Sequence, residues 1–133
     1  MSPSTVKFIK ASLVYLVAAS TLGALFAIFP NLRAYKYAHV HLNLLGFMAM
    51  MVYGVGNHIL PRFQGKPLHS ERLAEFQFWL ANIGLIALVA FESLKTATGQ
   101  KPFVVLTAVA GLVELLSIYL FVYNMWSTFR RKA

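Results

Sequence analysis

Four apolar stretches alternate with short polar segments along this chain of 133 residues. They cover about residues 8–29, 37–60, 71–94 and 103–126. Each has roughly the 20 residues that an α-helix needs to cross about 30 Å of hydrocarbon. The pattern predicts an all-α, polytopic membrane protein in which four transmembrane helices form one domain over residues 1–133.

The composition agrees with a membrane location and removes several kinds of site. Hydrophobic residues make up 59% of the chain and charged residues only 12%, whereas a soluble domain has about 25% charged residues. There is no cysteine, which excludes disulfides, iron–sulfur clusters, thiolate zinc sites and covalent haem attachment through a CxxCH motif. Any haem must therefore be held by histidine or another non-thiolate ligand.

Basic residues outnumber acidic ones and lie between and beside the apolar stretches. Twelve Lys and Arg against four Glu give a net charge of +8. In a soluble protein this charge would suggest nucleic acid, but here it indicates membrane topology and contact with anionic lipid headgroups. We therefore expect no nucleic-acid partner, and we expect a multi-pass protein of the prokaryotic inner membrane.

The two ends of the expected bundle differ in their basic residues. One end has eight of them, namely Lys7, Lys10, Arg62, Lys66, Arg72, Arg130, Arg131 and Lys132, and the other has four, namely Arg33, Lys36, Lys95 and Lys101. Because the side richer in Lys and Arg usually faces the cytoplasm, both termini are predicted to be cytoplasmic. His39 and His41 then lie near the outer face.

His39 and His41 are the most informative residues of the second apolar stretch. Ionisable side chains inside a membrane helix are costly and indicate function, and imidazole is a common axial ligand of haem iron. Residues two apart on an α-helix are separated by about 200°, so one helix offers these side chains to two irons rather than one. The same geometry disfavours a zinc site. The alternative is that each histidine only reaches interfacial water or a backbone carbonyl.

The residues that follow each histidine on its own helix face differ in character. The face of His39 carries small and polar residues, namely Asn43, Gly46, Met50 and Asn57, with Gly54 beside them. Such a face suits a bulky planar group or a closely packed helix. The face of His41 is apolar and continues through Leu45, Met48, Val52 and Ile59. On the first stretch, Ala19, Gly23 and Ala27 form a row of small residues that allows another helix to approach, although small residues are also common in membrane helices.

Three further polar groups allow alternative interpretations. Glu114, near the middle of the fourth stretch, is either a proton relay or a partner of Asn82, Asn43 or Ser117. Glu92 either orients a histidine ligand by accepting its free N–H or extends to the surface. Arg33 and Lys36 are either partners of haem propionates or simple loop charges.

The run from His39 to Gly65 resembles the tenth helix of subunit I of the haem–copper oxidase superfamily, which includes cytochrome oxidases and nitric oxide reductases. The shared positions are His39, His41, Gly46, Gly54 and Pro61. In that family the first histidine of the pair binds a high-spin haem and the second a low-spin haem. The resemblance implies that His39 and His41 bind the iron of haem b. The expected haem-contacting residues are therefore Arg33, His39, His41, Asn43, Gly46 and Met50.

The resemblance extends to one four-helix arc of the family's subunit, because the family's metal-binding histidines lie on the second helix of each arc. The family's copper ligands have no counterpart in these 133 residues, and the third stretch has no histidine. We therefore expect a haem b protein that transfers electrons without a copper centre and is not a complete oxidase by itself. The open alternatives are binding of a diatomic gas such as O2 or NO, a non-catalytic membrane subunit of a respiratory complex, and a transporter.

The partners follow from the same reasoning. We expect membrane lipid, a redox partner or quinol, and further copies of the chain. One four-helix unit cannot bury a macrocycle on each of two opposite faces of one helix. Three such arcs complete the ring of the oxidase family, so the resemblance favours a homotrimer. Each haem would then lie between His39 of one copy and His41 of the next.

Overall fold

The computed structural model describes residues 1–131, and Lys132 and Ala133 lie outside the described residues. The elements are α1 (Pro3–Ile28), the 3-10 helix η1 (Pro30–Tyr35), α2 (Lys36–His41), the π-helix η2 (Leu42–Ala49), α3 (Met50–Phe63), α4 (Glu71–Thr98) and α5 (Pro102–Arg130). No strand occurs between residues 1 and 131. Within these residues four helical stretches are long and apolar enough to cross a membrane, which confirms the predicted fold class.

The helices extend beyond the apolar stretches because their first and last turns contain polar residues and are closed by capping residues. The Ser2 hydroxyl accepts a hydrogen bond from the Thr5 N–H at the start of α1, and the Ser70 hydroxyl accepts one from the Leu73 N–H at the start of α4. Gly99 ends α4 in a left-handed conformation with φ of 68°, which glycine adopts without steric cost. Pro61 lies inside α3, whose last residue is Phe63.

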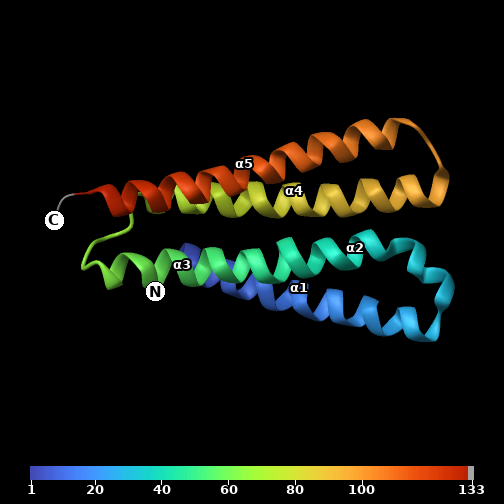
Figure 1. Ribbon diagram of the computed structural model, residues 1–133, viewed down its shortest axis with the longest axis horizontal. Helices are drawn as coiled ribbons and strands as arrows, with labels where there is room; N and C mark the ends of the chain where they lie inside the picture. Colours follow the sequence, from blue (N-terminus) through green and yellow to red (C-terminus); the bar gives the residue numbers. More distant parts are fainter. Residues whose placement is uncertain (132–133) are drawn as a thin grey trace.

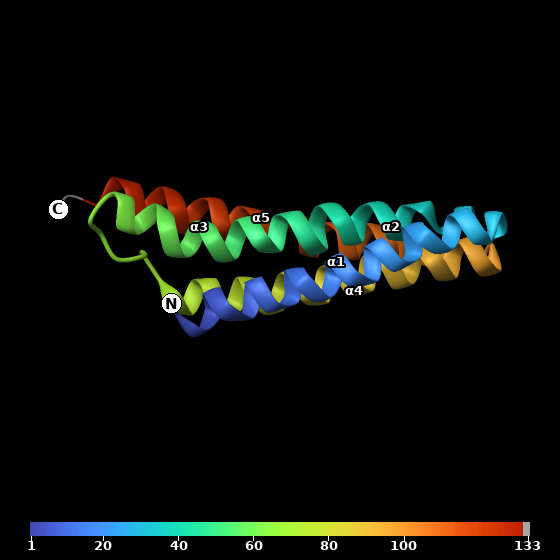
Figure 2. The same cartoon turned by 90° about the horizontal axis from the view of Figure 1, so that it is seen from below.

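The molecule consists of two antiparallel hairpins (Figure 1). In one, α1 packs along η2 and α3, and in the other α4 packs along α5. The chain start, the α3–α4 loop and the end of α5 lie at one end of the molecule. The segment η1 and the α4–α5 turn lie at the other end, which is also the end nearer to α2. The view turned by 90° shows the four long helices running roughly parallel to one axis (Figure 2).

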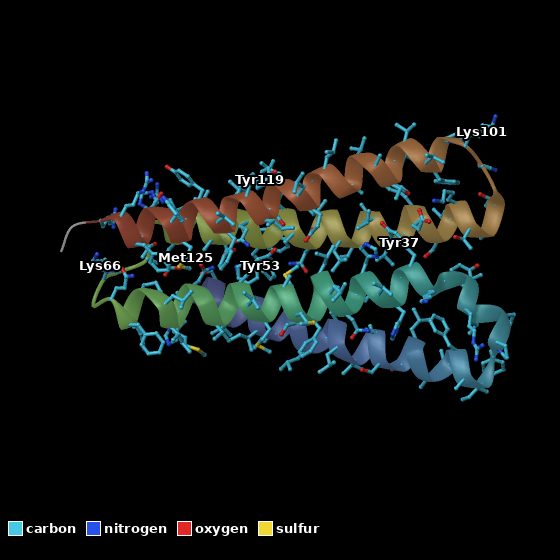
Figure 3. All side chains as sticks on the ribbon, viewed as in Figure 1. Tyr37, Tyr53, Lys66, Lys101, Tyr119 and Met125 are labelled. Carbon is cyan, nitrogen blue, oxygen red and sulfur yellow. The ribbon has the colours of Figure 1, made fainter. Side chains whose placement is uncertain are left out.

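A cluster of buried side chains joins the hairpins. Phe8, Met50, Tyr53 and Ala81 are each at most 4% exposed. The Phe8 ring packs edge-on against Tyr53 at 5.6 Å between centroids. Tyr53 also lies 4.8 Å from the ring of Phe121 on α5, so it occupies the space between the two hairpins (Figure 3). Aromatic packing of this kind contributes about 0.5–1.5 kcal/mol per pair beyond the area it buries.

Polar contacts also connect the helices. The Tyr15 hydroxyl on α1 donates to the Asn82 side chain on α4 at 2.7 Å. At the end of α5, the Asn124 amide bonds both to the N–H and to the carbonyl of Ser70, at 3.0 and 2.9 Å. These bonds satisfy polar groups that lipid could not satisfy, and they fix how each helix is rotated against its neighbour.

Candidate functional site

The helix that carries the histidines changes its winding directly after them. α2 ends at His41, and the π-helix η2 begins at Leu42 and continues to Ala49. π-Helical turns are rare and are frequent at functional sites. The sequence predicted a regular α-helix here, and no residue pattern in it indicated the wider turn.

His39 points into the first hairpin. A backbone carbonyl can only accept, so its ring Nδ1 donates to the Ala19 carbonyl on α1 at 2.9 Å. A Cβ added to Gly23 would lie 2.7 Å from His39 Cε1, and the Phe26 ring packs edge-on against the imidazole at 5.6 Å. The small residues Ala19 and Gly23 thus make room for this ring, whereas Ala27 of the same predicted row is exposed.

Asn43 lies one turn beyond His39 and contacts it twice. Its side-chain nitrogen donates to the His39 carbonyl at 3.1 Å and lies 3.4 Å from the ring Nε2. Because Nδ1 of His39 carries the proton, Nε2 is the acceptor in the longer contact. Both ring nitrogens of His39 therefore have a neighbour within the first hairpin.

His41 points to the other side of the same helix. Its Nδ1 donates to the Tyr37 carbonyl at 2.9 Å, and the two rings stack at 3.9 Å between centroids. Within residues 1–131 its Nε2 has no hydrogen-bond partner. Glu92 was one expected partner for a histidine, but it forms an ion pair with Lys95 at 2.6 Å. The group that orients His41 is a backbone carbonyl, as the alternative interpretation of the histidines expected, but the sequence did not indicate that it belongs to Tyr37.

A hollow of about 270 Å³ separates His41 from the second hairpin. Its lining includes Tyr37, His41 and Leu45 from the first hairpin and Leu88, Gly111 and Glu114 from the second. Tyr37 lies on the side of α2 that faces α4 and α5 (Figure 3). Gly111 leaves space, since a Cβ there would meet its nearest neighbour, Leu88, only at 3.7 Å.

Glu114 is the acidic side chain in this hollow, and it is only 2% exposed. Neither of its carboxyl oxygens has a hydrogen-bond partner within the described part of the chain. The predicted pairings are not formed: Asn82 accepts from Tyr15, Asn43 contacts His39, and the Ser117 hydroxyl donates to the Glu114 backbone carbonyl at 2.7 Å. The hollow thus contains an unpartnered carboxyl group besides the free Nε2 of His41.

The other residues expected at the site lie apart from this hollow. Arg33 is exposed on η1. Gly46 packs against α1, where an added Cβ would meet Tyr15 at 2.7 Å. Met50 is fully buried in the core cluster with Phe8. The structure therefore brings Asn43 to His39, and it places Gly46 and Met50 on the side of the helix that α1 already covers.

The Nδ1 atoms of both histidines are bonded in the way that suits a metal ligand. A ligating histidine usually donates its second ring N–H to a carbonyl or carboxylate, as the Nδ1 atoms of His39 and His41 do. Among residues 1–131 no three His or acidic side chains gather where they could hold a metal ion. An axial haem site needs fewer protein ligands than that, and at His41 an oriented ring, a free Nε2 and an adjacent hollow fit it.

Comparison with known proteins gives distant and partial relatives. The chain is 28% identical over 114 positions to cytochrome c oxidase subunit 1 of Rhodobacter capsulatus, a match that covers 68% of this chain and 21% of that protein. It is 22% identical over 156 positions to the cbb3-type cytochrome c oxidase subunit CcoN1 of Stutzerimonas stutzeri, with 96% and 33% covered. No family model matches the chain.

These partial matches limit which properties of the relatives can be assigned to this chain. The chain spans about a fifth to a third of the length of the relatives it matches. The similarity nevertheless agrees with the resemblance carried by His39, His41 and the glycines after them. The chain is a distant homologue of part of subunit I of the haem–copper oxidases, and its four apolar helices make it a multi-pass protein of the prokaryotic inner membrane.

Proposed function

We propose that this chain is an integral membrane haem b protein in which His41 is an axial ligand of the iron through Nε2. The observation that carries the proposal is the state of His41: its ring is fixed by the Tyr37 carbonyl, and its other nitrogen is free beside a hollow. Its distant relatives are named as cytochrome c oxidase subunits, which supports a role in respiratory electron transfer.

Haem, when bound, supplies one-electron chemistry, and the protein supplies orientation and exclusion of water. The Tyr37 carbonyl and the stacked Tyr37 ring hold the His41 imidazole in one tautomer and one plane. Leu45 and Leu88 give the hollow apolar walls, and Gly111 leaves room for a bulky group. Arg33 on η1 and Lys36, the first residue of α2, are the basic groups that propionates would contact.

His39 is proposed as the second ligand, and it acts in a neighbouring copy. Its Nδ1 is already bonded to a carbonyl, so Nε2 is the nitrogen available to a metal. Before Nε2 can bind a metal, the Asn43 amide must move out of its 3.4 Å contact with this atom, and α1 must move away from the ring near Gly23. A haem shared between His41 of one copy and His39 of the next is a head-to-tail contact, which we propose to close into a ring of three copies.

The size of the hollow supports completion by another copy. About 270 Å³ is below the usual range of about 300–1,000 Å³ for small-molecule pockets. One copy therefore covers only part of a macrocycle. Exposed apolar side chains such as Val14 and Leu112 remain free to meet lipid or a neighbouring subunit.

A second candidate function is binding of a diatomic gas. Within the described residues the hollow contains no second histidine opposite His41. If no neighbouring copy supplies one, the iron keeps an open position. In either case we propose little oxygen reduction by the isolated chain, because its sequence has no counterpart of the family's copper ligands.

Spectroscopy of the purified protein separates these functions. A pyridine haemochrome assay identifies haem b and measures its amount, and the reduced spectrum with and without CO reports whether a position is open. A reduced low-spin spectrum that CO leaves unchanged supports electron transfer through two histidines. A CO-sensitive spectrum supports gas binding, and absence of haem after expression in a haem-supplemented host contradicts both functions.

A further inference from the structure

Three buried side chains inside the bundle have polar atoms that the haem proposal does not use. Asn57 on α3, Gln77 on α4 and Glu114 on α5 are 4%, 1% and 2% exposed. Among residues 1–131, both terminal polar atoms of each side chain have no hydrogen-bond partner. Lipid cannot satisfy such groups, and leaving them unpaired is costly. Water is the usual partner of buried polar groups that the protein itself does not pair.

Gln77 and Glu114 lie at successive levels of the second hairpin. Asn124 of α5 bonds to Ser70, the residue before α4. Further along the hairpin, a Cβ at Gly84 would stand 2.9 Å from Glu114 Oε2, so these two residues are also opposite each other. The helices α4 and α5 run antiparallel (Figure 1), and Gln77 is midway between Ser70 and Gly84 in the sequence. It therefore lies about midway between the levels of Asn124 and Glu114.

The buried face of α5 is polar over the same length. Residues three or four apart share one face of a helix, and Glu114, Ser117, Phe121 and Asn124 have this spacing. Ser117 is fully buried, and its hydroxyl donates to the Glu114 carbonyl at 2.7 Å. This hydroxyl oxygen can still accept a hydrogen bond. Ser117 is thus a further polar group between the levels of Glu114 and Gln77.

The helix α3 joins this interface through Tyr53. The Tyr53 ring lies 4.8 Å from Phe121 of α5, and a Cβ at Gly56 would lie 3.3 Å from the same Phe121 ring. Asn57 follows Tyr53 by one turn on the same face of α3. It therefore lies at the same interface, nearer to the end of the bundle.

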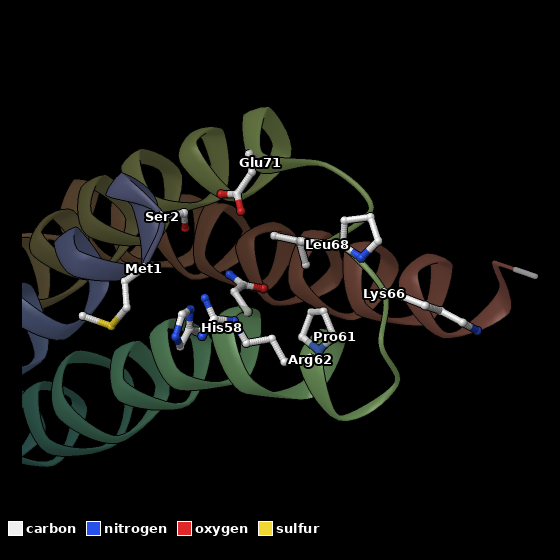
Figure 4. Close-up of a pocket in the computed structure, with 10 residues that line it drawn as sticks. Met1, Ser2, His58, Pro61, Arg62, Lys66, Leu68 and Glu71 are labelled. Carbon is white, nitrogen blue, oxygen red and sulfur yellow. The ribbon is translucent and has the colours of Figure 1, made fainter. Parts of the chain in front are cut away.

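These polar groups connect two hollows of the molecule. Asn57 lines a pocket of about 210 Å³ at the end opposite to the histidine pair, together with the exposed residues Arg62 and Glu71. This pocket lies between α3 and the start of α4 (Figure 4). Glu114 lines the hollow that also contains His41. The polar seam, defined as Asn57, Gln77, Ser117 and Glu114, thus runs from a pocket open to water to the proposed haem site.

We propose that the polar seam holds a chain of water molecules that transfers protons between the pocket and Glu114. Gln77 is seven residues from each end of the hairpin segment between Ser70 and Gly84, about 10 Å along the axis. The side chains and two or three waters span this distance at about 2.8 Å per hydrogen bond. When a proton from the pocket reaches the Glu114 carboxyl group, the group releases its own proton to the hollow and is left unchanged. The path needs no haem, so its test stands apart from that of the proposed function.

The test is the rate at which the Glu114 carboxyl group exchanges its proton for deuterium, followed by infrared spectroscopy of the purified full-length protein in lipid nanodiscs. The band of the protonated carboxyl group is assigned by its loss in Glu114→Gln. Gln77→Leu interrupts the seam and is expected to slow the exchange about tenfold, as expected for one lost hydrogen-bonding partner. Asn57→Leu, at the pocket end, is expected to have the same effect.

Two further variants are the controls. Asn82→Leu removes another amide of α4, one that is bonded to Tyr15 and lies outside the seam, and it is expected to keep the wild-type rate. Gln77→Ser keeps a polar side chain and leaves room for another water, so it is expected to exchange nearly as fast as the wild type. Thermal unfolding of each variant checks that it is folded.

Three results would overturn the proposal. Wild-type exchange in folded Gln77→Leu would show that Glu114 reaches water through the hollow rather than through the seam. Equal slowing in Gln77→Leu and Asn82→Leu would show a general change of packing rather than a path. The absence of a protonated carboxyl band in the wild type at neutral pH would show that Glu114 carries no proton to exchange.

Discussion

At the scale of single residues, the two histidines differ in what surrounds their second ring nitrogen. The Nε2 of His41 faces no hydrogen-bonding group within residues 1–131, whereas that of His39 lies 3.4 Å from the Asn43 amide and close to Gly23. Imidazole that is already oriented loses little freedom when it binds a metal. His41 is therefore the better prepared ligand in a single copy.

A substitution at Gly23 tests how closely His39 packs against α1 in the first hairpin. In the Gly23→Ala variant the new Cβ would stand 2.7 Å from His39 Cε1, so the ring must move and its bond to the Ala19 carbonyl weakens. We expect a loss of about 1–3 kcal/mol in the free energy of unfolding, measured by thermal unfolding in detergent. Ala27→Val, at an exposed position of the same row, should leave stability nearly unchanged, and an equal loss in both variants would contradict this packing.

The directions of the histidines could be predicted from the sequence, but their partners could not. A spacing of two residues separates side chains by about 200° on any α-helix, and the contacts of His39 and His41 follow it. Their hydrogen bonds go to the carbonyls of Ala19 and Tyr37, and every residue has a carbonyl, so no residue type indicates them. The pairing expected between Glu114 and Asn82 is not formed, because the Asn82 side chain accepts from Tyr15 on another helix.

At the scale of helices, the close packing of α4 on α5 depends on Gly84. A Cβ at this position would lie 2.9 Å from Glu114 Oε2 and 3.0 Å from its backbone nitrogen. The carboxyl group can rotate, but the backbone of α5 cannot move without separating the helices.

Gly84→Ala should therefore lower the free energy of unfolding by about 1–3 kcal/mol, measured by thermal unfolding in detergent. Gly111→Ala is the matched control in the facing helix, since its Cβ meets Leu88 only at 3.7 Å. Alanine in place of glycine at such an open helical position raises the free energy of unfolding by about 0.4–1 kcal/mol. A Gly84→Ala variant as stable as the wild type would contradict the close contact between α4 and α5 at this position.

The positions of the four long helices could be read from hydrophobicity, but the winding of the second one could not. The apolar stretches gave the number of spans, but α4 continues to Thr98, beyond the predicted end near residue 94. The π-helix from Leu42 to Ala49 has no signature in residue type. Within it Gly46 packs closely against Tyr15 of α1, a tertiary contact that the residue types did not indicate.

At the scale of the whole molecule, the orientation in the membrane is open to a direct test. Gln64 and Gln100 are exposed residues in loops at opposite ends, and the chain has no cysteine of its own. We expect that a membrane-impermeant maleimide added to whole cells labels Gln100→Cys, and that it labels Gln64→Cys only after permeabilisation. The reverse pattern would contradict the orientation based on basic residues.

Assembly is the second test at this scale. In the proposed electron-transfer function, a neighbouring copy completes the haem site, because the hollow in one copy is only about 270 Å³ and the second histidine lies on the opposite side of the same helix. Native mass spectrometry of the purified complex should give three copies. A stable dimer, or a monomer that keeps its full haem content, would contradict the ring.

The central claim is that His41 binds the haem iron, and the haem-to-subunit ratio of the intact complex tests it most directly. This ratio should fall by at least about tenfold in His41→Ala, because the oriented ligand is lost. It should stay at the wild-type value in His58→Ala, since His58 lies at the far end of the same helix. Wild-type haem content in purified, folded His41→Ala would contradict the account.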